Sequence, residues 1–170
     1  MAKTAGKRST LLLIAVGVAI VAPAGMLLAH DEHATGIFKV RHDEYHKLGD
    51  AFKVIRDQTK SGSPDMAKIK PAAQVVNDAS VNQFKWFPAG SGPQAGHKTR
   101  AKAEIWGKPQ DFEAAQKRFG GAAPKLLAAA NSGDAAAVKA QYAEVGKACK
   151  NCHDTFRAEE DEHEKHEKHE

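Results

Sequence analysis

The sequence predicts an all-α protein folded as an antiparallel four-helix bundle. Apolar residues recur at three- and four-residue steps in four separate stretches between residues 36 and 157, as amphipathic helices require. No stretch from residue 30 onward alternates apolar and polar residues for long enough to indicate a β-strand. Two short turns and one long connection separate the four stretches, which is typical of an antiparallel bundle.

The first two helices are predicted from Gly36 to Thr59 and from Asp65 to about Phe84. A turn at Ser61-Gly62-Ser63-Pro64 separates them, and Asp65 is placed to cap the second helix. Pro71 should kink that helix or delay its start, because proline cannot donate a helical hydrogen bond. The inward-facing residues of the two helices are Phe38, Val40, Tyr45, Leu48, Phe52 and Ile55, then Ile69, Ala72, Val75, Val76 and Ala79.

A crossover loop and two further helices follow. Residues from Trp86 to Thr99 contain too many glycines and prolines for any regular element. The third helix is predicted from Pro109 to about Asn131, although two glycines and a proline weaken its middle. Asp134 is placed to cap the fourth helix, whose inward-facing residues are Val138, Tyr142, Val145, Gly146, Cys149, Cys152, His153 and Phe156.

Residues 1–29 have the pattern of an export signal. Lys3, Lys7 and Arg8 precede an uncharged apolar run from Leu11 to Val21, and Ala22-Pro23-Ala24 offers a small-residue cleavage site. If the run extends through residue 29, it approaches the length of an uncleaved membrane anchor. Both readings place the folded part outside the cytoplasm, and we expect it in the periplasm.

The remaining residues divide into a domain and a tail. Residues 30–157 are predicted to form the bundle, and residues 158–170 a disordered tail rich in acids and histidines. The formal net charge of +4 combines a mildly basic body, whose bases are scattered among acids on the predicted helices, with the basic start and the acidic tail of the chain. A nucleic-acid binder needs a dense basic stripe, so we expect no nucleic-acid partner.

The segment Cys149-Lys150-Asn151-Cys152-His153 matches the C-x-x-C-H pattern of covalent haem attachment. In that pattern two thiols form thioethers with one haem c and the following histidine ligates its iron. On a helix, positions three and four residues apart share a face, so Cys149, Cys152 and His153 can meet one porphyrin. A disulfide, a thioredoxin-like pair and a zinc site fit less well, because the chain has only 2 cysteines and no βαβ pattern.

With this motif near the end of four helices, the chain resembles the class II c-type cytochromes, and most closely the cytochrome c prime family. The resemblance covers about residues 36–157. It is carried by Cys149 to Arg157, by Trp86-Phe87-Pro88-Ala89-Gly90-Ser91 leading to Glu104-Ile105-Trp106, and by Arg41 to Phe52. It implies a bundle wrapped around one haem that is attached to the last helix.

The resemblance also implies which helix-one residue faces the iron opposite His153. In low-spin relatives that residue is a methionine, four residues after an arginine that contacts a haem propionate. Aligning that arginine on Arg41 puts Tyr45 at the iron-facing position, and the first helix contains no methionine. A five-coordinate, high-spin iron is therefore implied. Three interpretations of Tyr45 stay open. Its hydroxyl donates a hydrogen bond to a bound diatomic ligand, its hydroxyl approaches the iron, or its side chain only covers the iron sterically.

Three further residues, Arg157, His42 and His46, are candidates for the haem surroundings. Arg157 lies one turn beyond His153, and by resemblance it borders the side of the haem where a gas can displace that histidine. A charge pairing at the helix C-terminus is the alternative for Arg157. His42 and His46 could replace the missing methionine, but their positions are rotated away from that of Tyr45, so solvated surface histidines are the better interpretation.

We expect a periplasmic cytochrome that binds nitric oxide or carbon monoxide and undergoes one-electron redox, rather than an enzyme. One alternative is a low-spin electron-transfer cytochrome whose sixth ligand is a histidine or tyrosine. Another is a periplasmic metal-binding protein that uses the His-rich ends of the chain. The resemblance also allows a homodimer built through the first two helices.

Overall fold

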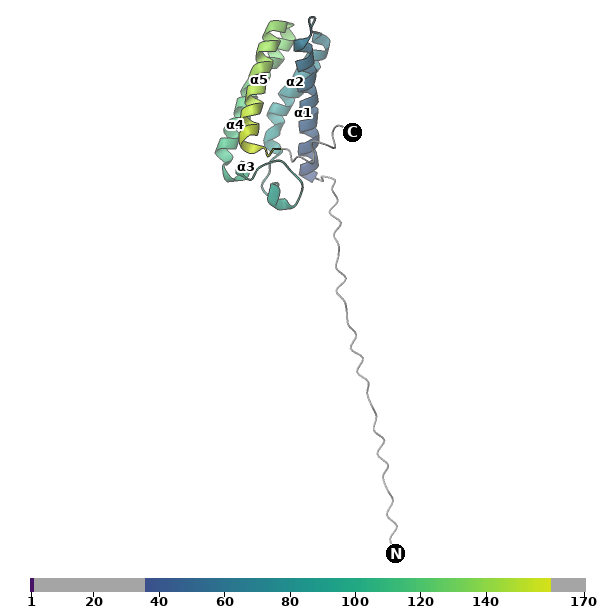
Figure 1. Ribbon diagram of the computed structural model, residues 1–170, viewed down its shortest axis with the longest axis vertical. Coiled ribbons are helices and arrows are strands. Elements are labelled where there is room, and N and C mark those ends of the chain that lie inside the picture. The colour runs from purple at the N-terminus through teal and green to yellow at the C-terminus, as the bar shows by residue number, and fades with distance from the viewer. Residues whose placement is uncertain (2–35, 160–170) are drawn as a thin grey trace. The chain divides into compact units, whose positions relative to one another are not determined.

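The computed structural model describes Met1 and residues 36–159; the predicted export segment and the tail from residue 160 lie outside the described residues. Four long helices run along one axis as an antiparallel bundle (Figure 1), which confirms the predicted fold class. No strand occurs among residues 36–159. The long helices are α1 (Gly36–Lys60), α2 (Met66–Asn82), α4 (Pro109–Ser132) and α5 (Ala135–Phe156). The short ones are η1 (Gln83–Lys85), η2 (Pro93–Ala95) and α3 (Glu104–Gly107).

Two aspartates begin helices as predicted. The side chain of Asp65 accepts a hydrogen bond from the Ala67 amide at 2.9 Å, and α2 starts at the next residue. Asp134 accepts from the amides of Ala136 and Ala137 at 2.9 and 3.0 Å and starts α5. Each such cap stabilises its helix by about 1 kcal/mol, because it satisfies amides that have no partner within the helix.

The prolines disturb the helices less than the sequence suggests. The expectation that Pro71 delays the second helix is wrong, because α2 begins at Met66 and continues through the proline. Pro124 likewise lies inside a continuous α4. In both helices the neighbouring side chains are buried, among them Ala72, Ala73 and Leu126. Tertiary packing therefore outweighs the local cost of each proline.

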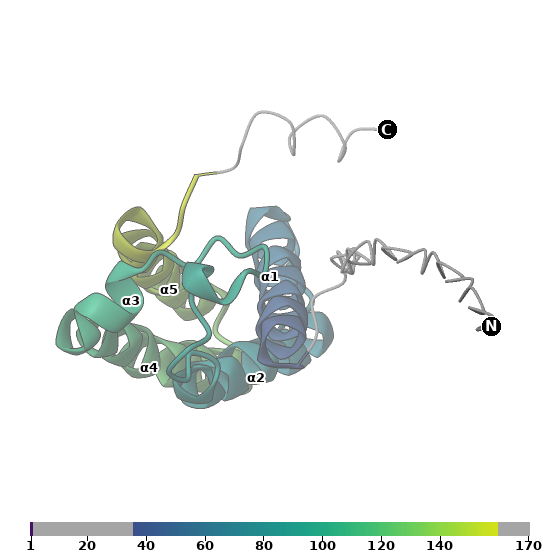
Figure 2. The ribbon, with the colours of Figure 1, turned by 90° about the horizontal axis from the view of Figure 1, so that it is seen from below.

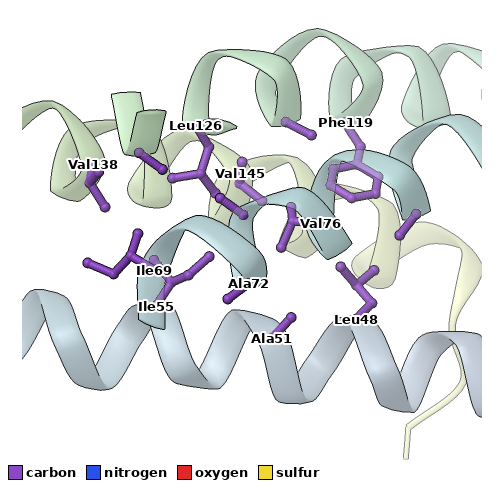
Figure 3. Packing of buried hydrophobic residues seen from close by; sticks show 14 of the residues in the cluster. Leu48, Ala51, Ile55, Ile69, Ala72, Val76, Phe119, Leu126, Val138 and Val145 are labelled. Atoms are coloured by element: carbon purple, nitrogen blue, oxygen red, sulfur yellow. The ribbon is translucent and has the colours of Figure 1, made fainter. Parts of the chain in front are cut away.

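The core lies between the four long helices (Figure 3). Its large, fully buried side chains come from all four of these helices: Ile55, Ile69, Val76, Leu126, Val138 and Val145. Burying a side chain of this size contributes about 1.5–3 kcal/mol, so these contacts dominate the stability of the bundle. No helix of the described residues has the length and apolar content that crossing a membrane requires.

The connection from residue 86 to residue 103, here called the crossover loop, lies at the end of the bundle where α1 starts and α5 finishes (Figures 1 and 2). The prediction of no regular element between residues 86 and 99 holds except for the single turn of η2. A short antiparallel bridge joins Ala101 to Arg157. In this bridge the Lys102 amide donates to the Phe156 carbonyl at 3.0 Å, which fixes the loop to the end of α5.

Truncation of a core side chain tests how much core packing contributes to the free energy of unfolding. Leu126→Ala should lower the free energy of unfolding by about 2–5 kcal/mol, because it removes apolar contacts and leaves a cavity. Val81→Ala, at a side chain that is 63% exposed on α2, is the matched control and should change it by less than about 0.5 kcal/mol. Urea unfolding followed by circular dichroism measures both, and equal effects would contradict the assignment of the core.

Candidate haem site

The C-x-x-C-H motif lies in the last turns of α5. Cys149 and Cys152 are half-buried, and their sulfurs are not joined in a disulfide. Cys149 packs against the main core, and Cys152 packs against a second apolar cluster formed by Ile105, Phe112, Ala115 and Phe156. The two thiols therefore stand on one face of α5, as their three-residue spacing requires.

The thiols are not activated for redox chemistry. Burial raises the pKa of Cys149 to about 11, with a smaller contribution from Cys152. Burial also raises the pKa of Cys152. A thioredoxin-like pair needs a lowered thiol pKa, because the thiolate is the nucleophile. The environment of these cysteines therefore argues against the redox-pair alternative.

Tyr45 on α1 faces these cysteines from across the bundle. Burial, followed by the charges of Cys152 and Cys149, raises the pKa of its phenol far above the ordinary value. Its ring packs edge-on against Trp86, with the ring centroids 4.9 Å apart. The hydroxyl has no hydrogen-bond partner within the described part of the chain. The Tyr45 hydroxyl is therefore a protonated hydrogen-bond donor that is available to a ligand on the face of α1 toward the cysteines.

The helices that carry these groups touch each other little. α1 makes far fewer contacts with α5 than with α2, although both pairs are neighbours in the bundle (Figure 2). One direct contact between them is a stack of Phe52 on Tyr142, with ring centroids 4.3 Å apart. Beside this stack lies Gly146, where an added Cβ would come within 3.7 Å of the Phe52 ring. α1 and α5 are thus the neighbouring pair of long helices with the least direct packing.

Arg41 is buried beneath the crossover loop rather than lying at the surface. Its Nε donates to the Trp86 carbonyl at 2.8 Å, one terminal nitrogen donates to the carbonyl and hydroxyl of Ser91, and the other donates to the Thr99 hydroxyl. The guanidinium carbon also lies 4.4 Å from the centre of the Phe87 ring. No carboxylate of residues 36–159 pairs with it. Burial accordingly lowers the pKa of Arg41.

The guanidinium of Arg41 can donate one more hydrogen bond. Four of the five guanidinium N–H groups have a neutral acceptor, which leaves one N–H of the nitrogen that bonds Thr99. A buried cation without a counter-charge is costly, so an anionic ligand at this N–H would stabilise the site. Haem carries carboxylates, and the residues present therefore fit it: two free thiols, an imidazole, a buried cation and apolar walls.

Basic residues surround His153 at the end of α5. A surface pocket of about 210 Å³ is lined by Arg100, Lys102, His153, Asp154, Arg157, Ala158 and Glu159. The prediction that His153 faces inward is wrong, because its side chain is exposed. Desolvation by the neighbouring groups, followed by the charges of Arg157 and Arg100, nevertheless lowers the pKa of His153. The imidazole is thereby kept neutral, which is the form that binds a metal.

Sequence reasoning missed Arg100. Its Nε and one terminal nitrogen donate to the Ala158 carbonyl at 3.0 and 2.8 Å, so it holds the chain just after α5 beside the pocket. No local pattern marks this residue, and the only signal was the length of the loop, since long loops often cover a ligand. His42 and His46 are exposed, in agreement with the interpretation of surface histidines.

A four-helix bundle that ends in a C-x-x-C-H motif, with a buried cation and a phenol facing the thiols, defines a class: the c-type haem proteins of the bundle fold. The comparisons with known proteins narrow this class to one family.

A family model described as Cytochrome C' matches residues 37–157. The chain is 32% identical over 117 residues to cytochrome c' of Rubrivivax gelatinosus, covering 69% of this chain and 90% of the relative. It is 31% identical over 149 residues to that of Allochromatium vinosum, covering 86% and 93%. The crystal structure of cytochrome c' from Thermochromatium tepidum superposes with a TM-score of 0.67 at 30% identity, covering 72% of this chain and 95% of that one. The chain belongs to the cytochrome c' family, and its cofactor is covalently bound haem c.

The contribution of the Arg41 hydrogen bonds to stability can be measured. Arg41→Lys should lower the free energy of unfolding by about 1–3 kcal/mol, because a single ammonium cannot reach the acceptors that the planar guanidinium bridges. Lys47→Ala, at an exposed position on the same helix, is the control and should change it by less than about 0.5 kcal/mol. An unchanged Arg41→Lys variant in urea unfolding would show that the loop is held by other contacts.

Proposed function

We propose that this protein is a periplasmic, high-spin cytochrome that binds a diatomic gas, nitric oxide or carbon monoxide, on the Tyr45 side of its haem. The observation that carries the proposal is the identity of the residue facing the thiols from α1. It is a tyrosine with a protonated phenol, and α1 contains no methionine that could fill the sixth position of the iron. The protein is proposed to bind gas and exchange single electrons rather than to act as an enzyme.

Each part of the motif has a proposed role. Cys149 and Cys152 form the two thioethers, and His153, kept neutral by its surroundings, holds the iron. Bound haem supplies an iron that changes between two oxidation states and takes up a small ligand. Arg41 orients the group through its remaining N–H, and Arg157 borders the His153 side. Solved structures of the family support gas binding, since they include nitric oxide complexes of variants of cytochrome c prime from Alcaligenes xylosoxidans.

The low-spin alternative has less support. A ligating tyrosine must lose its proton, and burial raises the pKa of Tyr45, which opposes that loss. His42 and His46 are exposed on α1, whereas Tyr45 faces the thiols. The third alternative, metal binding by the His-rich ends, concerns residues outside the described range and stays a prediction. The predicted export segment, cleaved or retained as an anchor, supports the periplasmic location.

A spectrum of the purified protein tests the coordination state. The ferrous protein should show the absorption of a five-coordinate high-spin haem and should change on addition of carbon monoxide. A low-spin ferrous spectrum without added gas would contradict the proposal and support the electron-transfer alternative. Electron paramagnetic resonance of the ferric protein gives an independent reading of the same spin state.

The role of the Tyr45 hydroxyl can be separated from its bulk. Tyr45→Phe should raise the dissociation rate of bound gas by about 2- to 13-fold, because a hydrogen bond contributes about 0.5–1.5 kcal/mol. The effect should be constant from about pH 6 to 9, because the raised pKa keeps the phenol protonated well above that range. Stopped-flow displacement measures the rate.

Tyr142, the second of the 2 tyrosines in the chain, provides the matched control. It stacks on Phe52, which lies seven residues, or about two helical turns, after Tyr45 on α1, so Tyr142→Phe removes a hydroxyl of the same type at a different level of the bundle. Its gas dissociation rate should equal that of the wild type. If Tyr45→Phe also matches the wild type, Tyr45 acts as steric cover only.

We also propose that the protein forms a homodimer through the outer face of α1 and α2. Val40 on α1, predicted to face inward, instead exposes 47% of its surface, and Val81 on α2 and Phe84 on the following η1 expose 63% and 45%. Beside them is a depression of about 380 Å³, lined by Ile37, Val40, Glu44, Asn82, Lys85 and Trp86. One similar structure is described as a cytochrome c' with ligand-controlled dimer dissociation. Trp86 touches Tyr45, so it connects the proposed dimer face to the proposed gas site.

A charge placed on this face should disrupt the dimer. Phe84→Asp is expected to weaken the association of the two subunits at least 10-fold, because it puts a carboxylate into an apolar contact. Analytical ultracentrifugation measures the monomer–dimer equilibrium. Lys125→Asp, at an exposed position on α4 and thus away from α1 and α2, serves as the control. A wild-type protein that is monomeric at all concentrations would refute the proposal.

A further inference from the structure

Two histidines of α1 take no part in the haem site. His42 and His46 are four residues apart, and both are exposed on the described surface. Their rings lie over each other on adjacent turns, with centroids 4.2 Å apart and an angle of 42° between the ring planes. Residues four apart on a helix share a face, so the two imidazoles can approach one ion together.

Asp43 gives one of these rings a preferred orientation. Its Oδ1 lies 3.3 Å from Nδ1 of His42. A carboxylate at Nδ1 holds the proton on that nitrogen and leaves Nε2 with the lone pair that a metal needs. This carboxylate–histidine arrangement is common behind metal-ligating histidines. The same Asp43 also accepts from Lys39, so it is held in place from both sides.

The backbone that carries the pair is rigid. Arg41 and Leu48, on either side of the two histidines in the sequence, are both buried. Arg41 is fixed by its bonds to the crossover loop, and Leu48 belongs to the main core. The spacing of the two Cβ atoms is thus set by the fold before any ion binds, which lowers the entropic cost of chelation.

We propose that His42 and His46 chelate a divalent transition metal of the kind that imidazole prefers, namely Cu²⁺, Ni²⁺ or Zn²⁺. No group of three or more suitable side chains converges among the described residues, so water completes the coordination. Mg²⁺ and Ca²⁺, which prefer oxygen ligands, do not bind here. This site is independent of the haem and of the proposed gas binding.

Histidine modification read residue by residue tests the site in the full-length holoprotein. The protein is treated with diethylpyrocarbonate at increasing Zn²⁺, digested, and the modification of each histidine is measured by mass spectrometry. His42 and His46 should become protected together, at a Zn²⁺ concentration at least 10-fold below that needed for His97. His97 is an exposed single histidine whose ring lies tilted against that of Phe38, so it is the internal reference for one imidazole.

Two variants decide whether the two rings act together. His46→Ala should shift the protection of His42 to at least 10-fold higher Zn²⁺, because a chelate becomes a single ligand. His97→Ala should leave the protection of His42 and His46 unchanged, and Mg²⁺ should protect neither. The proposal is overturned if the protection of His42 is the same with and without His46. It is also overturned if His42 and His97 are protected at the same Zn²⁺ concentration. Zinc binding at the His-rich ends of the chain does not interfere, because those histidines lie on other peptides of the digest.

Discussion

The site depends on one buried cation, the guanidinium of Arg41. Its bonds to the Trp86 carbonyl and to Ser91 hold the crossover loop against α1. The same loop places the rings of Trp86 and Phe87 over Tyr45, with centroid distances of 4.9 and 6.1 Å. The apolar cover that raises the pKa of the Tyr45 phenol is therefore held in place by a charge. Because neutral groups alone accept its N–H bonds, the arginine retains the capacity to attract an anion.

The other end of the crossover loop is fixed to α5. The bridge between Ala101 and Arg157 and the bonds from Arg100 to the Ala158 carbonyl hold the chain just beyond the C-x-x-C-H motif. Arg100 and Arg157 are thereby kept close enough to lower the pKa of His153. One connection thus determines the surroundings of both faces of the proposed haem plane. It covers the tyrosine on α1 and places positive charge beside the histidine on α5.

The helices could be predicted from the sequence because their signals are local. Apolar spacing sets each helical stripe, and the side chains of Asp65 and Asp134 cap the next residues along the chain. The C-x-x-C-H motif is local in the same sense. The partners of Arg41 could not be predicted, because they are loop carbonyls and hydroxyls brought close only by the tertiary fold. The predicted delay of α2 at Pro71 is wrong for the opposite reason, since burial of the surrounding side chains outweighs a local rule.

The geometry of a single helix explains why α1 can carry two kinds of polar chemistry. Successive residues of an α-helix are rotated by about 100°. Arg41 and Tyr45, four residues apart, therefore share the face toward the loop and the thiols, while His42 and His46 share a face that is turned toward solvent. The inner pair is desolvated, which keeps the phenol protonated and leaves the guanidinium in need of an anion. The outer pair stays hydrated, so its imidazoles remain available to ions from solution. The four-residue spacing thus puts Arg41, which can bind an anion, on the inner face of α1. It puts His42 and His46, the proposed cation ligands, on the outer face of the same helix.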